Sequence, residues 1–352
     1  MNLRLLLLPF SWLFSLIARV RNIAYDQNWI KHTRFELPVI LVGNLSVGGT
    51  GKTPHVGYII SLFYKNYRVA TLSRGYGRKS TGFVVAGKGT NASLIGDEPM
   101  LYFSKYDNIT VSVCEDRVEG VNRLLKLNPA PQVVVMDDGF QHRSIDPGLK
   151  ILLTSWNHLY CDDFVLPAGN LREPASGYKR ADIIIVTKCP LNLSAAQKSD
   201  VKARLKPTAS QQLFFSSISY ESLRPAFPAA NGSVDLSHSK SVLLVTGIAD
   251  PAPMLSYFNT LDISPEILTF PDHHQFTEKD AHAIRKKFDS FADPKAIIVT
   301  TEKDLQRLKN PEMVSLLSDL PLFYLPITIT LDHQKEFINI LETYVAKSKR
   351  NS

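Results

Sequence analysis

Short apolar runs, separated by turns that contain glycine and proline, recur through the first half of the chain. Several of these runs are continuous rather than alternating, which is typical of parallel strands covered by helices on both faces. Stretches with helical spacing lie between them, so the pattern predicts a doubly wound α/β/α core domain. The predicted strands are Val39–Val42, Arg68–Leu72, Thr110–Val113, Gln132–Met136, Lys150–Leu153 and Asp182–Thr187. Helices are predicted to follow residue 52, to begin at Pro99 and to cover Asp116–Leu127.

The second half contains a break at Arg224–Lys240, where Pro, Gly, Ser and Asn are concentrated. This composition predicts a linker. A second, smaller α/β domain follows, with strands at Ser241–Thr246, Ala296–Thr300 and Leu322–Leu325, and a closing helix is predicted from His333 to Ala346. The predicted segments are an N-terminal helix at 1–22, the core domain at 23–223, the linker at 224–240, the second domain at 241–330, and the closing helix and tail at 331–352.

The N-terminal segment contains an apolar stretch, Leu5–Ala18, with arginines on both flanks. It is shorter than the roughly 20 apolar residues that a helix needs to span a bilayer. A signal peptide and a buried terminal helix are alternatives, but no convincing small-x-small cleavage site follows the stretch. We favour an amphipathic or apolar helix in the interface of an anionic cytoplasmic leaflet, with its arginines on lipid phosphates. The aromatic side chains expected among the headgroups are Phe10, Trp12 and Phe14.

Composition and charge indicate the cellular compartment of the protein and the class of partner that it binds. With 44% hydrophobic and 21% charged residues the chain is that of an ordinary globular protein. Its three cysteines, Cys114, Cys161 and Cys189, lie far apart without ligand spacing, which argues against a disulfide framework and fits a reducing compartment. The formal net charge of +7 indicates an anionic partner, either nucleic acid, acidic lipid or a phosphorylated substrate.

The strand Val39–Val42 leads into the glycine-rich stretch VGNLSVGGTGKTP, which ends at Pro54. Its glycines allow backbone N–H groups to approach phosphate oxygens, and a helix that starts near Lys52 points its positive end at the same anion. Lys52 would reach the terminal phosphates and the Thr53 hydroxyl would contact magnesium. We therefore favour a nucleotide-binding loop over a plain turn, although Ser46 stands where the general pattern has Gly or Ala. The predicted nucleotide-binding residues are Ser46, Val47, Gly48, Gly49, Thr50, Gly51, Lys52 and Thr53.

The stretch QVVVMDDGFQHR is an apolar strand that ends in two carboxylates, Asp137 and Asp138. In enzymes with a phosphate-binding loop, such a strand lies beside the strand of the loop, and its terminal acid holds magnesium. Asp-Asp-Gly is also good turn chemistry, but together with Gly-Lys-Thr it favours a metal site. His142 and Arg143 follow closely and could approach the phosphates.

Two loops carry cations that either bind phosphate or are solvated turns. VLPAGNLREP is bounded by proline and contains Arg172 and Glu173, whereas the glycine-rich SRGYGRK contains three cations and Tyr76.

Two further stretches contain titratable groups of open role. In LIGDEPML, Asp97 and Glu98 precede Pro99, which by itself is typical of a helix cap. TFPDHHQFT packs two histidines and an aspartate between aromatic residues. Histidine is the usual proton carrier near neutral pH, but a metal site and a structural loop are alternatives for this stretch.

Taken together, these stretches resemble one family, tetraacyldisaccharide 4'-kinase, the lipid A kinase of Gram-negative envelopes. The matching segments cover residues 1 to about 305. The family's phosphate loop also begins as it does here at Ser46. In chain order the segments are the apolar N-terminus, VGNLSVGGTGKTP, SRGYGRK, GDEP, DDGFQHR, LPAGNLREP, ADIIIVTK, FPDHHQF and TTEKD.

The resemblance implies an ATP-dependent kinase with Mg²⁺ as its metal. The family transfers the γ-phosphate to the 4'-hydroxyl of a tetraacylated glucosamine disaccharide 1-phosphate, at the cytoplasmic face of the bacterial inner membrane. The implied fold has two α/β/α domains joined by a short two-stranded linker, with the active site in the cleft. The implied partners are the lipid substrate and an anionic membrane surface, with no nucleic acid.

Motif by motif, the resemblance also implies roles for individual residues. Asp97, a cap by local pattern, becomes the catalytic base, paired with His273 of the second domain. Lys52 takes phosphate at the catalytic centre. The implied magnesium and catalytic carboxylates and hydroxyl are Thr53, Asp137, Asp138 and, as a further metal contact, Glu173. The residues at matching positions in or near the substrate site are Tyr76, Arg117, His142 and Arg172.

Two other classes of function remain as alternatives. A switch-type GTPase or ATPase that loads or targets a client would also need the phosphate loop. Guanine readers of that class usually carry Asn-Lys-x-Asp after a late strand, whereas this chain has Thr187-Lys188-Cys189-Pro190 without the aspartate. A non-catalytic membrane-bound adaptor is the third interpretation.

Overall fold

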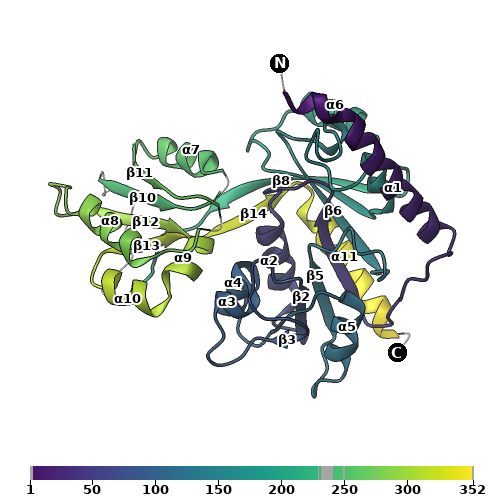
Figure 1. Ribbon diagram of the computed structural model, residues 1–352, viewed down its shortest axis with the longest axis horizontal. Coiled ribbons are helices and arrows are strands. Elements are labelled where there is room, and N and C mark those ends of the chain that lie inside the picture. Colours follow the sequence, from purple (N-terminus) through teal and green to yellow (C-terminus); the bar gives the residue numbers. More distant parts are fainter. Residues whose placement is uncertain (1–2, 229, 231–240, 249, 273, 351–352) are drawn as a thin grey trace. The chain divides into compact units, whose positions relative to one another are not determined.

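The chain forms two compact units, Met1–Ile218 with Ile329–Ser352, and Ser219–Thr328. The computed structural model describes residues 3–228, 230, 241–248, 250–272 and 274–350 (Figure 1). The division falls within two strands, β8 (Gln212–Tyr220) and β14 (Ile327–Leu331), which are neighbours in the sheet order. The boundaries of 223, 240 and 330 drawn from the sequence stay a prediction.

The first unit is built on a nine-stranded sheet in the order β14-β8-β7-β6-β1-β5-β2-β4-β3. From β8 to β4 every neighbouring pair is parallel, and β3 pairs antiparallel with β4. β1, β2, β5 and β7 are buried along their whole length, as their continuous apolar runs predict. The remaining strands are β1 (Val39–Asn44), β2 (Val69–Ser73), β3 (Val84–Val85), β4 (Thr110–Val113), β5 (Val133–Asp137), β6 (Leu149–Ser155) and β7 (Ile183–Thr187).

Helices cover both faces of this sheet, which confirms the predicted doubly wound α/β/α core. One apolar cluster joins α2, α4 and α11 to one face, and a second joins α5 and α6 to the other. The closing helix α11 belongs to the first unit, because Phe337, Leu341 and Val345 are buried in its core. The helices are α2 (Lys52–Phe63), α3 (Ala92–Ile95), α4 (Asp97–Lys105), α5 (Arg117–Leu125), α6 (Ala195–Leu205) and α11 (Gln334–Arg350), with 3₁₀ turns η2 (Tyr160–Asp162) and η3 (Ala175–Arg180).

The second unit contains a five-stranded sheet in the order β11-β10-β12-β13-β9, parallel except for β9. The α8, α9 and α10 helices pack on one face and α7 on the other. This confirms the smaller α/β domain. Its strands are β9 (Arg224–Pro225), β10 (Val242–Thr246), β11 (Glu266–Thr269), β12 (Ile297–Thr301) and β13 (Leu322–Leu325). Its helices are α7 (Ala252–Thr260), α8 (Glu278–Phe288), α9 (Glu302–Leu308) and α10 (Pro311–Leu317).

The stretch predicted as a linker, 224–240, begins with β9, which pairs with β13 of the second unit. Residues 229 and 231–240 of this stretch lie outside the described residues.

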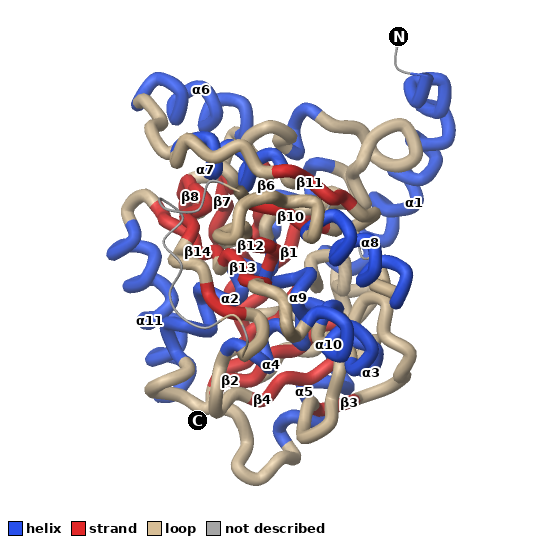
Figure 2. The backbone as a smooth tube through the Cα atoms, turned by 90° about the vertical axis from the view of Figure 1, so that its left-hand side faces the viewer, coloured by secondary structure: helices blue, strands red, loops and turns tan. Residues whose placement is uncertain are grey.

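The N-terminal apolar helix is present as the 3₁₀ turn η1 (Leu3–Leu7) followed by α1 (Leu8–Asp26). Figures 1 and 2 show α1 at the periphery of the first unit, away from the sheet. Its buried residues are the small Ser11 and Ala18, whereas its large apolar residues are exposed. By length and composition alone, Arg4–Asp26 is also long and apolar enough to cross a membrane. The exposed large apolar side chains from Leu8 to Asp26 are Phe10, Trp12, Leu13, Phe14, Leu16, Ile17, Val20 and Ile23.

Candidate active site

Predicted site motifs of the first unit meet at one edge of its sheet, the edge formed by the carboxyl ends of its parallel strands. β1, β5, β2 and β4 are consecutive neighbours and parallel, so their carboxyl ends lie side by side. The glycine-rich loop follows β1, the two aspartates end β5, SRGYGRK follows β2 and Arg117 follows β4. Ligands of open α/β sheets bind at this edge.

The glycine-rich loop has the backbone that its glycines allow. Gly48 and Gly51 have φ of 101° and 82°, which residues with a side chain rarely adopt. Thr50 is buried and fixes the loop from below. Its hydroxyl accepts from Asn44 Nδ2 at 2.9 Å, and its carbonyl accepts from the Thr187 hydroxyl at 2.8 Å. Residues 47–49 are exposed, so the loop is a cradle open to a ligand.

His55 contacts the last glycine of this loop, and the sequence pattern did not indicate a role for it. Its ring is buried in the first turn of α2, where Nδ1 donates to the Gly51 carbonyl at 2.6 Å and Nε2 lies 2.9 Å from the Ser216 hydroxyl. Burial lowers the pKa of His55 to about 4, against the Gly51 hydrogen bond. The imidazole is therefore neutral and structural at physiological pH.

Lys52, Arg172 and Asp138 form a charged cluster beside the cradle. The Arg172 guanidinium contacts both carboxylate oxygens of Asp138, at 2.8 and 3.2 Å, and also donates to Asn44 Oδ1. Lys52 Nζ lies 3.3 Å from Asn44 Oδ1 and 3.8 Å from Asp138 Oδ2. Burial alone would raise the pKa of Asp138, but Lys52 and Arg172 outweigh it and hold this pKa below its ordinary value. Two cations are thus held in place at the cradle.

Arg117 supports Asp138 from beneath. Its side chain is fully buried, and its guanidinium donates to the carbonyls of Cys114 and, at 3.4 Å, Asp138. Asp138 itself has φ of 51°, a left-handed backbone that needs such support in a residue with a side chain. Burial lowers the pKa of Arg117 to about 10, which still leaves the group charged at neutral pH.

Asp137 occupies a different environment from its neighbour. It is buried, and its Oδ2 accepts from the Tyr102 hydroxyl at 2.8 Å. Burial raises the pKa of Asp137 to about 7, and the nearby Glu98 adds to the rise while Lys52 opposes it. Among the described residues its Oδ1 has no hydrogen-bond partner. A buried carboxylate oxygen in this state fits a cation or a water bound to one.

These residues fit Mg²⁺ held largely by phosphate and water. The described part of the chain contains no cluster of three or more His, Cys, Asp or Glu side chains that could enclose an ion. Mg²⁺ typically takes only one or two carboxylates from a protein and completes its shell with substrate phosphates and water. Asp137, Asp138 and the Thr53 hydroxyl at the cradle are such a set.

Asp97 is the first residue of α4, where it is 8% exposed. The prediction that this helix begins at Pro99 with Asp97 as its cap is wrong by two residues, because Gly96, with φ of 92°, occupies the cap position. The SRGYGRK loop packs tightly here. A Cβ added at Gly75 would lie 2.8 Å from the Ile95 carbonyl, and one at Gly96 would lie 3.0 Å from the Tyr76 carbonyl. The loop after β2 and the start of α4 therefore form one surface.

Tyr76, His142 and Arg143, which were predicted to lie near the substrate or its phosphates, differ in exposure and in their contacts. Tyr76 is 72% exposed in its loop. His142 is half-buried in the turn after β5, and burial together with the nearby Arg117 lowers its pKa to about 4, so it is uncharged. Arg143 turns away from the cradle to α1, where it donates to the Asn22 carbonyl at 2.8 Å and pairs with Asp26 at 2.7 Å.

Glu173 lies in the core, paired with Arg180. It is fully buried, and Arg180 Nη2 contacts its two oxygens at 2.8 and 2.9 Å. Gln141 and Asn22 donate to the same carboxylate, each at 3.2 Å. Because each oxygen already accepts two hydrogen bonds, the contacts of Glu173 are those of a structural residue, and the metal contact expected for it stays a prediction.

Removing the Glu173 carboxylate is expected to affect stability strongly. Glu173→Ala leaves the Arg180 side chain, which is 18% exposed, without its counter-charge, and breaking a largely buried pair typically costs about 3–5 kcal/mol of unfolding free energy. Denaturant unfolding checks this. The matched control is Asp162→Ala, which breaks an exposed pair with Arg204 and is expected to cost less than about 1 kcal/mol. Equal losses of unfolding free energy in the two variants would contradict a structural role for Glu173.

The loop that contains LREP connects α1 to the cradle. The Arg4 guanidinium donates to the Pro167 carbonyl at 3.2 Å and to Asn170 Oδ1 at 3.0 Å, and the Ala168 N–H donates to the Ser11 hydroxyl at 2.9 Å. On its other side the same loop binds the glycine-rich loop. The Val47 N–H donates to the Asn170 carbonyl and the Arg172 N–H to the Leu45 carbonyl, each at 2.7 Å. Hydrogen bonds thus join three segments into one layer: the N-terminal helical segment, the loop at 165–174 and the glycine-rich loop.

In the second unit, His274 of the FPDHHQF loop is held by neighbouring side chains. His274 Nε2 lies 2.9 Å from Asp280 Oδ2, and the ring of His274 stacks on Phe270 with centroids 5.0 Å apart. His274 is therefore engaged structurally. His273, the expected partner of Asp97, lies outside the described residues.

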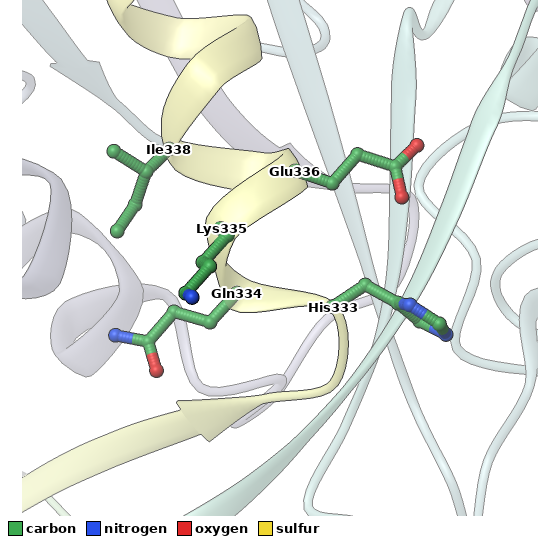
Figure 3. A pocket seen from close by; sticks show the side chains of 5 residues that line it. All are labelled: His333, Gln334, Lys335, Glu336 and Ile338. Atoms are coloured by element: carbon green, nitrogen blue, oxygen red, sulfur yellow. The ribbon is translucent and has the colours of Figure 1, made fainter.

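A separate cavity of about 660 Å³ lies at the start of α11. Figure 3 shows its lining from the first turns of that helix, and none of the lining residues is a predicted site residue. The cavity is lined by His333, Gln334, Lys335, Glu336 and Ile338.

Comparison with known proteins decides between the classes of function left open above. A family model described as tetraacyldisaccharide-1-P 4'-kinase matches residues 3–346. The chain belongs to this family. A curated relative from Flavobacterium johnsoniae is 46% identical over 342 residues, which cover 97% of each chain. Another from Bacteroides thetaiotaomicron is 42% identical over 358 residues, covering 98% of this chain and 94% of the relative. Both are named tetraacyldisaccharide 4'-kinase.

A solved structure supports the same family. The crystal structure of LpxK from Aquifex aeolicus in complex with ATP matches with a TM-score of 0.74 and 30% identity, and the match covers 97% of this chain and 99% of that one. The family resemblance is therefore confirmed, and the chain is a kinase. The alternatives of a switch GTPase and of a non-catalytic adaptor are not supported.

Family membership does not by itself assign the site residues, so their roles stay predictions. The geometry adds three residues that the motif search did not single out, Asn44, Tyr102 and Thr187, besides His55. Tyr102 and Thr187 make their site contacts with Asp137 and Thr50, which are far from them in the sequence, so the linear pattern does not join them. Asn44 lies in the glycine-rich stretch itself, where it bonds Thr50 and Lys52 and also accepts from Arg172.

Proposed function

We propose that this kinase transfers the γ-phosphate of ATP to the 4'-hydroxyl of a tetraacyldisaccharide 1-phosphate. The observation that carries the proposal is the sheet edge described above. This edge contains the exposed glycine-rich loop that follows β1, the charged side chains of Lys52 and Arg172, and the two aspartates at the end of β5. The start of α4, with Asp97 as its first residue, adjoins it. Phosphoryl transfer depends mainly on positioning and on cationic stabilisation, and this edge supplies both.

In the proposed reaction the 4'-oxygen attacks the γ-phosphorus while the bond from that phosphorus to the β–γ bridging oxygen breaks, so ADP leaves. The hydroxyl proton passes to the Asp97 carboxylate, which acts as general base. Bound Mg²⁺ would neutralise charge on the β- and γ-phosphates, with Thr53, Asp137 and Asp138 as the residues that hold it.

Lys52 and Arg172 orient and stabilise the phosphates in this scheme. Both already share Asn44 and Asp138 as partners, so their charged ends are held before ATP binds. Charge that is placed in advance stabilises a transition state without reorganisation at the moment of reaction. His273 is proposed to hydrogen-bond the Asp97 carboxylate, and this role rests on the motif match alone.

The enzyme is proposed to act at the cytoplasmic face of the bacterial inner membrane. The family and the apolar N-terminal helix are consistent with membrane association. On α1 the usual arrangement of a soluble helix is reversed, since small residues face the protein and large apolar residues face outward. Such a surface fits the headgroup and acyl boundary of a bilayer, where the acyl chains of the substrate lie.

The test of the proposed function is a product assay. The full chain is incubated with labelled ATP or GTP and a panel of lipid A precursors, and the products are analysed by mass. We expect one added phosphate on the tetraacyldisaccharide 1-phosphate with ATP. Phosphate consumption from GTP but not from ATP, or phosphate released only to water, would contradict the proposal.

Charged substitutions on the outer face of α1 are expected to weaken membrane binding. Phe10 and Trp12 are 65% and 70% exposed, so Phe10→Glu with Trp12→Glu leaves the contacts of the helix with the protein in place. Two such side chains contribute about 3 kcal/mol or more when buried, equivalent to about 100-fold in vesicle affinity. Co-sedimentation with anionic vesicles measures this. Leu191→Glu, at a 76% exposed position outside α1, is the control and should bind as the parent does.

A further inference from the structure

A chain of hydroxyl groups connects the phosphate loop to the end of β5. The Tyr102 hydroxyl of α4 donates to Asp137 Oδ2 at 2.8 Å, and it also interacts with the Thr53 side chain. Tyr102 is 1% exposed, so both contacts are made in the protein interior.

The direction of these two contacts follows from proton counting. A phenol has one proton to donate, and Tyr102 gives it to Asp137. The Thr53 hydroxyl must therefore donate its own proton to the Tyr102 oxygen. Both lone pairs of the Thr53 oxygen are then left to accept, and a hydroxyl that contacts a cation does so through a lone pair. Asp137 likewise keeps its Oδ1 without a hydrogen-bond partner among the described residues.

We propose that Tyr102 is a positioning residue that orients the Thr53 hydroxyl and the Asp137 carboxylate toward one divalent cation. The inference rests on the proposed function, because it takes the cation to be the one that accompanies the nucleotide. Tyr102 touches neither the nucleotide nor the metal in this role and acts through its two partners. The same helix begins with Asp97, so α4 also links the proposed base to the cation residues.

The chain offers a matched control one helical turn away. Tyr106 directly follows α4, and its hydroxyl donates to the Gly57 carbonyl of α2 at 2.7 Å. Tyr102→Phe and Tyr106→Phe each remove one phenolic oxygen from the α4 region, but only Tyr102→Phe removes a hydrogen bond to a carboxylate of the candidate site. A purely structural role for Tyr102 would make the two variants alike, whereas only Tyr102→Phe disturbs Thr53 and Asp137.

The experiment measures ADP binding to the full-length protein by calorimetry, with Mg²⁺ and with EDTA, so that no turnover is required. We expect Tyr102→Phe to lose about 10- to 100-fold of the affinity gained with Mg²⁺, the range typical of lost outer-shell partners, with affinity in EDTA unchanged. Tyr106→Phe should keep the full gain. In assays of activity, the Mg²⁺ midpoint of Tyr102→Phe should rise while KM for the lipid stays constant.

Several results would overturn the inference. A full Mg²⁺ gain in Tyr102→Phe, or equal losses in both variants, would make Tyr102 an ordinary structural residue. So would failure of Tyr102→Phe to fold in EDTA while Tyr106→Phe folds. A double-mutant cycle adds an independent measure, because the losses of Thr53→Ala and Tyr102→Phe should be less than additive if Tyr102 acts through Thr53, and additive losses would contradict this. If the parent protein itself shows no Mg²⁺-dependent ADP binding, the proposed function fails rather than the role of Tyr102 alone.

Discussion

Asp97→Asn is expected to lower kcat by about 10²- to 10⁴-fold, the usual contribution of a general base. Asparagine has nearly the same size and can still hydrogen-bond, but it cannot accept the proton of a sugar hydroxyl. Binding of ATP should stay nearly intact, because the cradle and its two cations belong to other segments. Steady-state kinetics with lipid substrate and nucleotide-binding measurements check the two halves of this expectation.

The neighbouring acid is the control for Asp97. Glu98→Gln removes a negative charge from the next position of α4, so it tests whether charge alone at the start of this helix matters. Either substitution removes an acid from the first helical turn, which costs only about 0.3–1 kcal/mol in stability. We expect Glu98→Gln to be much the more active of the two. Loss of ATP binding in Asp97→Asn would instead mark Asp97 as structural, and an unchanged kcat would remove it from the mechanism.

Lys52→Ala is expected to have the second large effect, a fall in kcat of about 10²- to 10³-fold, as for other pre-placed groups that stabilise transition-state charge. The rest of the cluster should persist in this variant, since Asp138 and Asn44 keep their contacts with Arg172. The protein should therefore fold normally and lose catalysis. Single-turnover kinetics separate the loss in the chemical step from any loss of ATP binding.

Lys65→Ala provides the matched change at the other end of α2, where the lysine is exposed and lies over the Tyr64 ring. Its kcat should equal that of the parent. A Lys52→Ala protein that retains kcat within about tenfold of the parent would show that Arg172 and the cradle suffice, contrary to the role proposed for the lysine.

Much of the first sheet was predictable, because each buried parallel strand is a continuous apolar run in the sequence. The strands that were missed carry weaker local signals. β8 mixes serines with aromatic residues, β11 is mostly exposed at a sheet edge, and β14 alternates threonine with apolar residues directly after a proline. These strands depend on tertiary partners, which outweigh local propensity.

The candidate site was predictable where one motif carries the chemistry and not where distant segments meet. The glycine-rich loop and the two aspartates are each contiguous, so their patterns indicate phosphate and metal. Tyr102 is 35 positions from Asp137, and its role appears only once the fold brings its hydroxyl to the end of β5. In LREP, consecutive side chains point in opposite directions, so Arg172 reaches Asp138 while Glu173 enters the core, a distinction that the order of letters does not contain.

The hydrogen-bonded layer between α1 and the glycine-rich loop has a practical consequence for work with this enzyme. Cutting off the first two dozen residues to obtain a detergent-free sample would remove Arg4, Ser11 and Asn22, whose contacts brace the backbone that supports the ATP cradle. Poor turnover of such a shortened protein would then mix two defects, lost access to lipid and a loosened nucleotide pocket. If the proposed function holds, recruitment to the bilayer and phosphate chemistry share one scaffold, and surface-directed changes on the outward side of the helix separate them.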